Sequence, residues 1–217
     1  MLLQSIIPEQ RTVLYNVSWE TFEALLRDTG EDRGSRFAYD CGTLEIMTPL
    51  FEHENPKIQF DRLIFVLAEE LKIKIRSAGS TTLKRKSITK AIEPDNCYYI
   101  QNEQAIRGKQ ELDLTKDPVP DLALEIDITS TSLNKLNIYI ALGIVELWRY
   151  DGERLKFYQL LENQYIEITL SIAFPLISVS DINRFIQKSK IMDEIDLVQS
   201  FRVWVREKIE SSSDFRE

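Results

Sequence analysis

The sequence lacks the features that define several large classes of protein. No apolar run among its 217 residues approaches the roughly 18–20 residues that a transmembrane helix needs. The first residues carry no basic start before a short apolar stretch and no small-residue cleavage site, so we expect no secretory signal. Cys41 and Cys97 are too few for a disulfide framework and lack C-x-x-C spacing. We therefore expect a cytoplasmic protein whose two cysteines are reduced and lie in strands.

The chain also has no excess of positive charge, since 35 acidic residues outnumber 27 basic ones. The formal net charge is −8, which argues against a protein that coats nucleic acid through bulk electrostatics. The distribution is uneven, because residues 71–92 hold seven basic side chains and no acidic one. Lys84, Arg85 and Lys86 in this segment are candidates for contact with nucleic-acid phosphates. The alternative is a basic edge that is merely solvated, and the sequence leaves both interpretations open.

The chain shows no internal repeat, no low-complexity stretch and no Pro/Gly/Ser-rich linker. Its apolar and charged fractions, 43% and 29%, are ordinary for a globular protein. We therefore predict one domain over residues 1–217, with a core at roughly 36–180. A helical extension would occupy residues 1–35 and a helical tail residues 181–217.

Three elements are expected before the core strands. Ser18 stands where an N-cap belongs, ahead of a helical apolar pattern that Gly30 and Gly34 interrupt. Residues 36–47 alternate around a turn-like centre and predict a hairpin. An amphipathic helix is predicted from about His53 to Lys72, because apolar residues recur there at helical spacing.

The remaining elements predict an α/β fold. Strand-like runs cover residues 73–77, 81–86, 96–100, 122–128 and 145–150, with a further hairpin at 154–170. Thr131 or Ser132 could cap a helix that ends near Gly143, and helices follow from Ser180. A helix, three strands, a helix and a strand suggest a mixed central sheet with helices on both faces and added hairpins.

Two acidic residues are the first candidates for chemistry. Asp95 follows Pro94 at the start of a predicted strand, although Pro-Asp pairs are also common in turns. Glu125 lies among apolar neighbours in a strand that is predicted to be buried, so its charge needs a partner. Two such carboxylates on adjacent strands could bind one Mg²⁺ or Mn²⁺ ion. A nearby lysine or arginine is the alternative partner for Glu125.

Three further residues could join this pair. His53, the only histidine, and Glu54 stand at the start of the long helix, where an acidic residue also simply favours the helix dipole. Lys135 falls in the helix after the Glu125 strand. A lysine beside a metal-binding carboxylate could orient the attacking water or stabilise a charged transition state, but a helix lysine is often only solvated.

Taken together, these motifs resemble the PD-(D/E)XK nuclease superfamily and, within it, the Uma family of restriction-endonuclease-like proteins. The segments that resemble the family are the Pro-Asp pair at 94–95, residues 120–125, which end in Glu125, and the Tyr-to-Trp stretch within 138–151. The segment from Gly42 to Pro49, followed by His53, also resembles the family pattern. The resemblance covers roughly residues 15–180.

The resemblance implies a restriction-endonuclease-like fold and Mg²⁺-dependent (or Mn²⁺-dependent) hydrolysis of phosphodiester bonds, with DNA the expected substrate. Asp95 and Glu125 would bind the metal, and Glu54 or His53 would fill the position of the helical acidic residue. The sequence departs from the motif at Asp127, where a lysine is expected, and Lys135 is the candidate to replace it.

The sequence leaves two other functional hypotheses open. The chain could keep the nuclease fold without the chemistry and act as a nucleic-acid-binding module. It could also be a protein-interaction module, with a homodimer formed through the helical stripe of Val198, Phe201, Val205 and Ile209. The same stripe could instead pack on the chain's own core.

Overall fold

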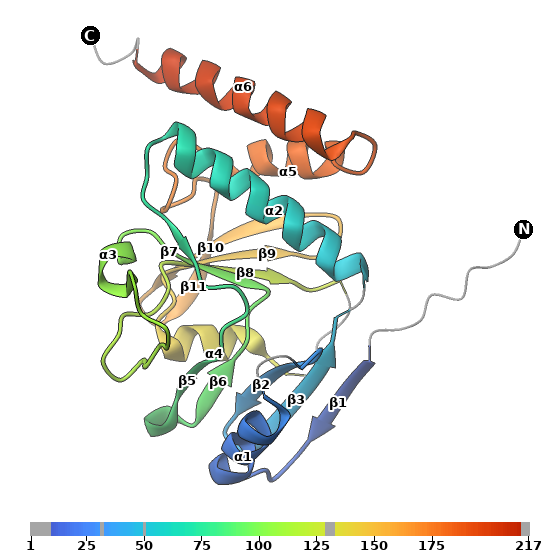
Figure 1. The fold of residues 1–217 in the computed structure, drawn as a ribbon, viewed down its shortest axis with the longest axis vertical. Helices are drawn as coiled ribbons and strands as arrows, with labels where there is room; N and C mark the ends of the chain where they lie inside the picture. The colour runs from blue at the N-terminus through green and yellow to red at the C-terminus, as the bar shows by residue number, and fades with distance from the viewer. Residues whose placement is uncertain (1–9, 31–32, 50, 129–132, 214–217) are drawn as a thin grey trace, which may run out of the picture.

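The protein is described by a computed structural model that covers residues 10–30, 33–49, 51–128 and 133–213. Two β-sheets and six helices make up the described part of the chain (Figure 1). The central sheet has six strands in the order β11-β10-β9-β8-β7-β4. Along the chain these are β4 (Arg76–Ser77), β7 (Asn96–Tyr99), β8 (Leu122–Ile126), β9 (Glu146–Tyr150), β10 (Leu155–Leu161) and β11 (Gln164–Ile168).

The second sheet has five strands in the order β1-β3-β2-β6-β5. They are β1 (Gln10–Leu14), β2 (Arg36–Asp40), β3 (Thr43–Thr48), β5 (Leu83–Arg85) and β6 (Lys90–Ile92). The helices are α1 (Trp19–Thr29), α2 (Phe51–Glu70), α3 (Glu103–Ile106), α4 (Lys135–Leu142), α5 (Val179–Lys188) and α6 (Glu194–Ser213), with a 3₁₀ turn η1 (Lys86–Ile88).

The central sheet is mixed, as predicted. Strands β8 and β9 run parallel and are joined through α4, while the other neighbouring pairs are antiparallel. Leaving out α3 and the elements of the second sheet, the order α2, β4, β7, β8, α4, β9 matches the expected core of helix, three strands, helix and strand. Figure 1 shows α2 on one side of this sheet and α4 on the other. The fold class predicted from the sequence is confirmed.

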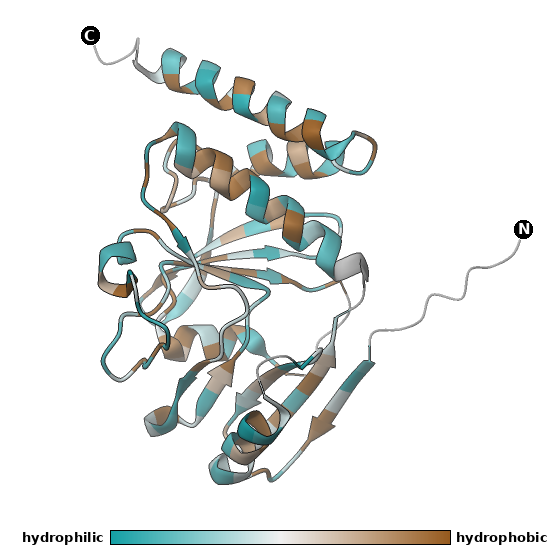
Figure 2. Cartoon of the chain, viewed as in Figure 1, coloured by the Kyte–Doolittle hydropathy of each residue, from teal (hydrophilic) through white to brown (hydrophobic). Residues whose placement is uncertain are grey.

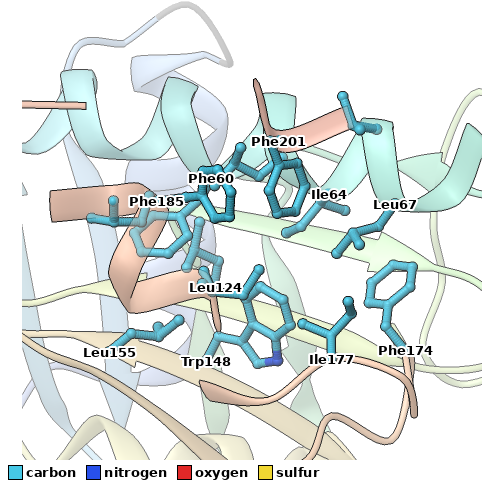
Figure 3. Packing of buried hydrophobic residues seen from close by; sticks show 14 of the residues in the cluster. Phe60, Ile64, Leu67, Leu124, Trp148, Leu155, Phe174, Ile177, Phe185 and Phe201 are labelled. Carbon is cyan, nitrogen blue, oxygen red and sulfur yellow. The ribbon is translucent and has the colours of Figure 1, made fainter. Parts of the chain in front are cut away.

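One face of the central sheet packs against α2 and α5, and α6 lies over these two helices. The apolar side chains of β8 on this face, Leu122, Leu124 and Ile126, are fully buried, and Trp148 of β9 lies beside them. Figure 3 shows Trp148 and Leu124 beneath the apolar side chains of the three helices. This face is closed mainly by hydrophobic contact, with the Tyr98 hydroxyl of β7 bonded to Asp61 of α2.

The other face of the central sheet carries α4, which also contacts β2, β5 and β6 of the second sheet. Residues of α4 are therefore enclosed between the two sheets. The strand predicted over residues 81–86 belongs to the second sheet as β5, and β1 and β6 were not predicted. In the segment predicted as a helical extension, β1 pairs with β3 and precedes the predicted helix α1.

Several local predictions are confirmed and others are wrong. The Ser18 hydroxyl accepts a hydrogen bond from the Thr21 N–H at 3.1 Å and caps α1. Cys41 lies in the exposed turn of the β2–β3 hairpin rather than in a strand, whereas Cys97 is buried in β7. Helix α4 begins at Lys135. The predicted caps at residues 131 and 132 lie outside the described residues.

The C-terminal helices pack on the chain's own core. Phe201 and Val205 of α6 are fully buried in the cluster that contains α2 and the central sheet. Figure 2 shows α6 alternating between hydrophobic and hydrophilic residues, as expected for a helix with one packed face. Arg202 and Arg206 of α6 also bind Glu70 of α2. Within the described residues, none of the helices has the length and apolar character needed to cross a membrane.

Candidate active site

Asp95 and Glu125 lie side by side on neighbouring strands. Asn96 of β7 is paired with Leu124 of β8 in an antiparallel register, so the preceding residue, Asp95, falls next to Glu125. The Asp95 N–H donates to the Leu124 carbonyl at 3.1 Å, and Asp95 Oδ2 accepts from the Ile126 N–H at 2.6 Å. These two hydrogen bonds flank Glu125. The adjacency that the metal-site hypothesis needs is therefore present.

Glu125 points to the face of the sheet that carries α4. Side chains alternate along β8, so Leu124 and Ile126 face α2 while Glu125 faces the opposite way. Its Oε2 accepts a hydrogen bond from the Tyr139 hydroxyl at 2.6 Å, and its Oε1 accepts one from Lys135 Nζ. All three side chains are buried or nearly so.

Helix α4 supplies both partners of Glu125 because of its periodicity. Lys135 and Tyr139 are four residues apart and so lie on one face of the helix, one turn from each other. Burial raises the pKa of the Tyr139 hydroxyl well above its ordinary value, and the adjacent Glu125 carboxylate adds to the rise. Tyr139 is consequently a neutral hydrogen-bond donor at physiological pH.

Asp95 has a cationic partner from the second sheet. Arg36, the first residue of β2, donates through Nη1 to Asp95 Oδ1 and through Nη2 to Glu54 Oε1, the latter at 2.9 Å. Glu54 lies near the start of α2 and also faces Lys57 at 3.5 Å. Arg36 thus brings together the ends of β2, β7 and α2. It connects Asp95 with one of the two residues predicted for the helical acidic position.

Asp127 takes the place where the superfamily motif has lysine, and it is paired with arginine. Its Oδ2 accepts a hydrogen bond from Arg149 Nη2 at 2.6 Å, and Arg11 Nη2 lies 3.6 Å from Oδ1. Arg11 in turn donates to Glu45 at 3.0 Å. Buried carboxylates and basic groups therefore alternate around the end of β8.

A small cavity of about 40 Å³ opens at this place. Its polar lining comes from four charged side chains, a tyrosine and an asparagine: Glu125, Asp127, Lys135, Arg149, Tyr139 and Asn134. That volume is enough for about one water molecule or ion. A larger hollow of about 840 Å³ between α2 and α6 is lined mainly by apolar residues and holds none of the predicted site residues.

The donor set suits a hard cation. Carboxylate oxygens are the ligands that Mg²⁺ and Mn²⁺ prefer, and Mg²⁺ is commonly held by one or two carboxylates with water and phosphate completing its shell. Among the described residues no group of three or more His, Cys, Asp or Glu side chains could hold a metal ion. Asp95 and Glu125 together fit the two-carboxylate arrangement.

The remaining predicted residues are spread more widely. His53 lies in the first turn of α2, but its side chain is outside the described part of the structure. Lys84 and Lys86 form exposed ion pairs with Glu23 and Glu20 of α1, at 3.1 and 3.2 Å. Arg85 donates to the Leu114 carbonyl at 3.4 Å. These three basic residues thus lie in β5 and η1, beside the second sheet, and two of them are paired with acidic residues of α1.

The second Pro-Asp pair has a structural task. Asp121 accepts hydrogen bonds from the backbone N–H groups of Ile100 and Asn102, at 2.6 and 3.0 Å, and from the Asn102 side chain. It therefore fixes the loop after β7 and contacts none of the residues around Glu125. Of the two Pro-Asp pairs, only Pro94-Asp95 reaches the candidate site.

Sequence reasoning missed Arg36, Tyr139 and Arg149. Arg149 could have been found, because it alternates with buried Trp148 and Tyr150 and so must point to the face that carries Glu125. Tyr139 is four residues from Lys135, so the helical spacing that directs Lys135 toward Glu125 directs Tyr139 there as well. No local signal indicates Arg36, which is 59 positions from Asp95.

The mixed central sheet with α2 and α4 on its two faces is a restriction-endonuclease-like fold. The sequence matches the family described as "Uma2: Putative restriction endonuclease" over residues 19–182, and the chain belongs to that family. Its fold is similar to that of "a putative nuclease belonging to DUF820" from Anabaena variabilis, with 16% sequence identity and a TM-score of 0.49. That comparison covers 69% of this chain and 90% of the other. None of the curated proteins compared with the chain matches it.

Proposed function

We propose that the protein is a metal-dependent endonuclease that hydrolyses phosphodiester bonds in nucleic acid, with DNA as the substrate. Family membership supports a nuclease. The observation that carries the proposal is the contact between Lys135 and Glu125, with Asp95 beside Glu125 on the next strand. A carboxylate pair that could hold a cation, with an adjacent lysine that could stabilise charge on the phosphate, is suited to this chemistry.

Asp95 and Glu125 would hold Mg²⁺ or Mn²⁺, which when bound would lower the pKa of a coordinated water and offset negative charge at phosphorus. Lys135 Nζ would place a positive charge where the phosphate gains negative charge, because its contact with Glu125 fixes it at the site. Tyr139 would keep Glu125 in place through its hydrogen bond to Oε2. Glu54, connected to Asp95 through Arg36, would be the acidic residue from the helix.

The experiment is a cleavage assay on supercoiled plasmid DNA and on single-stranded RNA, with Mg²⁺, Mn²⁺ or EDTA. We expect DNA cleavage that needs the cation and is lost in Asp95→Asn. Asp121→Asn is the matched control, since it alters the other Pro-Asp pair away from the site. Cleavage by Asp95→Asn at the wild-type rate would overturn the site assignment, and cleavage of RNA alone would correct the substrate.

One observation favours a second candidate function, a nucleic-acid-binding protein without catalysis. Both oxygens of Asp95 and both oxygens of Glu125 already accept hydrogen bonds, two of them from cationic side chains. Such pairing competes with a metal ion for the same oxygens. Wild-type protein that binds DNA but shows no cation-dependent cleavage would favour this alternative.

A further inference from the structure

Arg149 is held at the edge of the site by a buried carboxylate. The Asp127 side chain is 3% exposed and that of Arg149 is 36% exposed, and 2.6 Å separates Arg149 Nη2 from Asp127 Oδ2. Among the described residues this is the one hydrogen bond that the guanidinium group makes. A guanidinium has five N–H donors, so most of its hydrogen-bonding capacity remains for a ligand.

The position of Arg149 is set by strand pairing. In the parallel register of β8 and β9, Arg149 is the partner of Glu125. Neighbouring strands lie about 4.8 Å apart, so the Arg149 side chain leaves the sheet directly beside that of Glu125. Both line the cavity of about 40 Å³, together with Lys135. Two cationic side chains therefore flank Glu125, one from α4 and one from β9.

The chemistry of this arrangement suits a phosphate. A planar guanidinium binds phosphate oxygens through two parallel hydrogen bonds, and its affinity depends on being held in the right orientation. Asp127 supplies that orientation from a buried position. Burying a carboxylate for packing alone is unfavourable, and an apolar pair would fill the same space. Asp127 Oδ1 accepts no hydrogen bond within the described part of the chain, and its nearest cationic group, Arg11 Nη2, lies 3.6 Å away.

We infer that Arg149, oriented by Asp127, binds a phosphate group of the nucleic acid next to Glu125. This inference rests on the proposed function, since it assumes that nucleic acid occupies the site. In it Arg149 contacts substrate, and Asp127 is a positioning residue that acts through Arg149. Arg149 then adds a second positive charge beside that of Lys135, from the opposite side of Glu125.

Salt-dependent binding tests the role of Arg149. Affinity for a 20-base-pair DNA duplex is measured by fluorescence anisotropy in EDTA over a range of salt concentrations. Loss of one phosphate contact reduces the slope of log K against log salt by about 0.9 and weakens binding roughly eightfold at 0.1 M salt. We expect this change in Arg149→Met. Lys156→Met, which removes an exposed lysine of β10 paired with Glu167, is the matched control and should leave the slope unchanged.

DNA binding by Asp127→Asn tests the role of Asp127. Removing a negative charge strengthens nucleic-acid binding if only bulk electrostatics matters. Asp127→Asn should instead weaken it, because Arg149 loses its orientation. In the Arg149→Met background the Asp127→Asn change should cause no further loss, which a double-mutant cycle measures directly. The double variant Asp127→Asn/Arg149→Met has no buried carboxylate that has lost Arg149. It can therefore be used to measure DNA binding where Arg149→Met alone does not fold.

The outcomes separate the inference from the proposed function. An unchanged salt slope in Arg149→Met, or tighter binding by Asp127→Asn, overturns the inference while wild-type cleavage still supports the nuclease. Wild-type protein that neither binds nor cleaves nucleic acid overturns both. A reduced slope with weaker binding by Asp127→Asn supports the inference even in a variant that retains cleavage.

Discussion

Replacing Lys135 with methionine should destabilise the protein, because it leaves the Glu125 carboxylate buried without its cation. Glu125 is 2% exposed and Lys135 9% exposed. Removing one partner of such a buried pair costs about 3–5 kcal/mol, and the remaining Tyr139 hydrogen bond places the expected loss near 3 kcal/mol. In a chain of this size that corresponds to a fall in melting temperature of roughly 6–12 °C.

The double variant Glu125→Gln/Lys135→Met provides the internal test of this reasoning. Removing both charges leaves no unpaired ion, so the double variant should be more stable than Lys135→Met alone. Urea denaturation followed by circular dichroism gives the free energies of unfolding, with Lys156→Met as the exposed control. If Lys135→Met costs no more than that control, or if adding Glu125→Gln lowers stability further, Lys135 is not the counter-ion of Glu125.

Three other predictions follow from the ion pairs and hydrogen bonds. Arg36→Met should raise the calorimetric affinity for Mn²⁺ in the absence of nucleic acid, because Arg36 occupies an oxygen of Asp95; weaker binding would contradict this. Tyr139→Phe should lower stability by about 1.5–3 kcal/mol in urea denaturation, the range for a hydrogen bond to a charged group, and an unchanged midpoint would exclude that bond. Hydrogen bonds from the α6 arginines lower the pKa of Glu70 from 4.5 to about 2. A lowered pKa in the folded state stabilises above about pH 4.5, and the stabilisation is lost as pH falls toward about 2. Glu70→Gln should therefore flatten the stability profile in that window, and an unaltered profile would count against the contact.

The central part of the fold could be predicted because its elements are long and periodic. The amphipathic stripe of α2 and the continuous apolar run around Glu125 are local signals that burial imposes. The second sheet could not be predicted to the same degree. Its strands β5 and β6 have three residues each, too few to show an alternating pattern, and β6 pairs with β2 across about 50 residues of chain.

The site was predictable only where chemistry forces a partner. A buried glutamate must be compensated, so Glu125 could be identified. Asp95 and Lys135 were candidates from their places on the neighbouring strand and helix, and the family resemblance then gave them their expected roles. The contact of Lys135 with Glu125 is present in the structure. Arg36 depends on how the two sheets pack, which no short segment of sequence encodes.

The most direct test of a cation held jointly by Asp95 and Glu125 is a calorimetric titration of the 217-residue chain with Mn²⁺. Wild-type protein should bind with a saturable isotherm, and Asp95→Asn and Glu125→Gln should each weaken binding by tenfold or more, equivalent to about 1.4 kcal/mol. Wild-type affinity in either variant, or no saturable binding in the wild type, would contradict the proposed metal site.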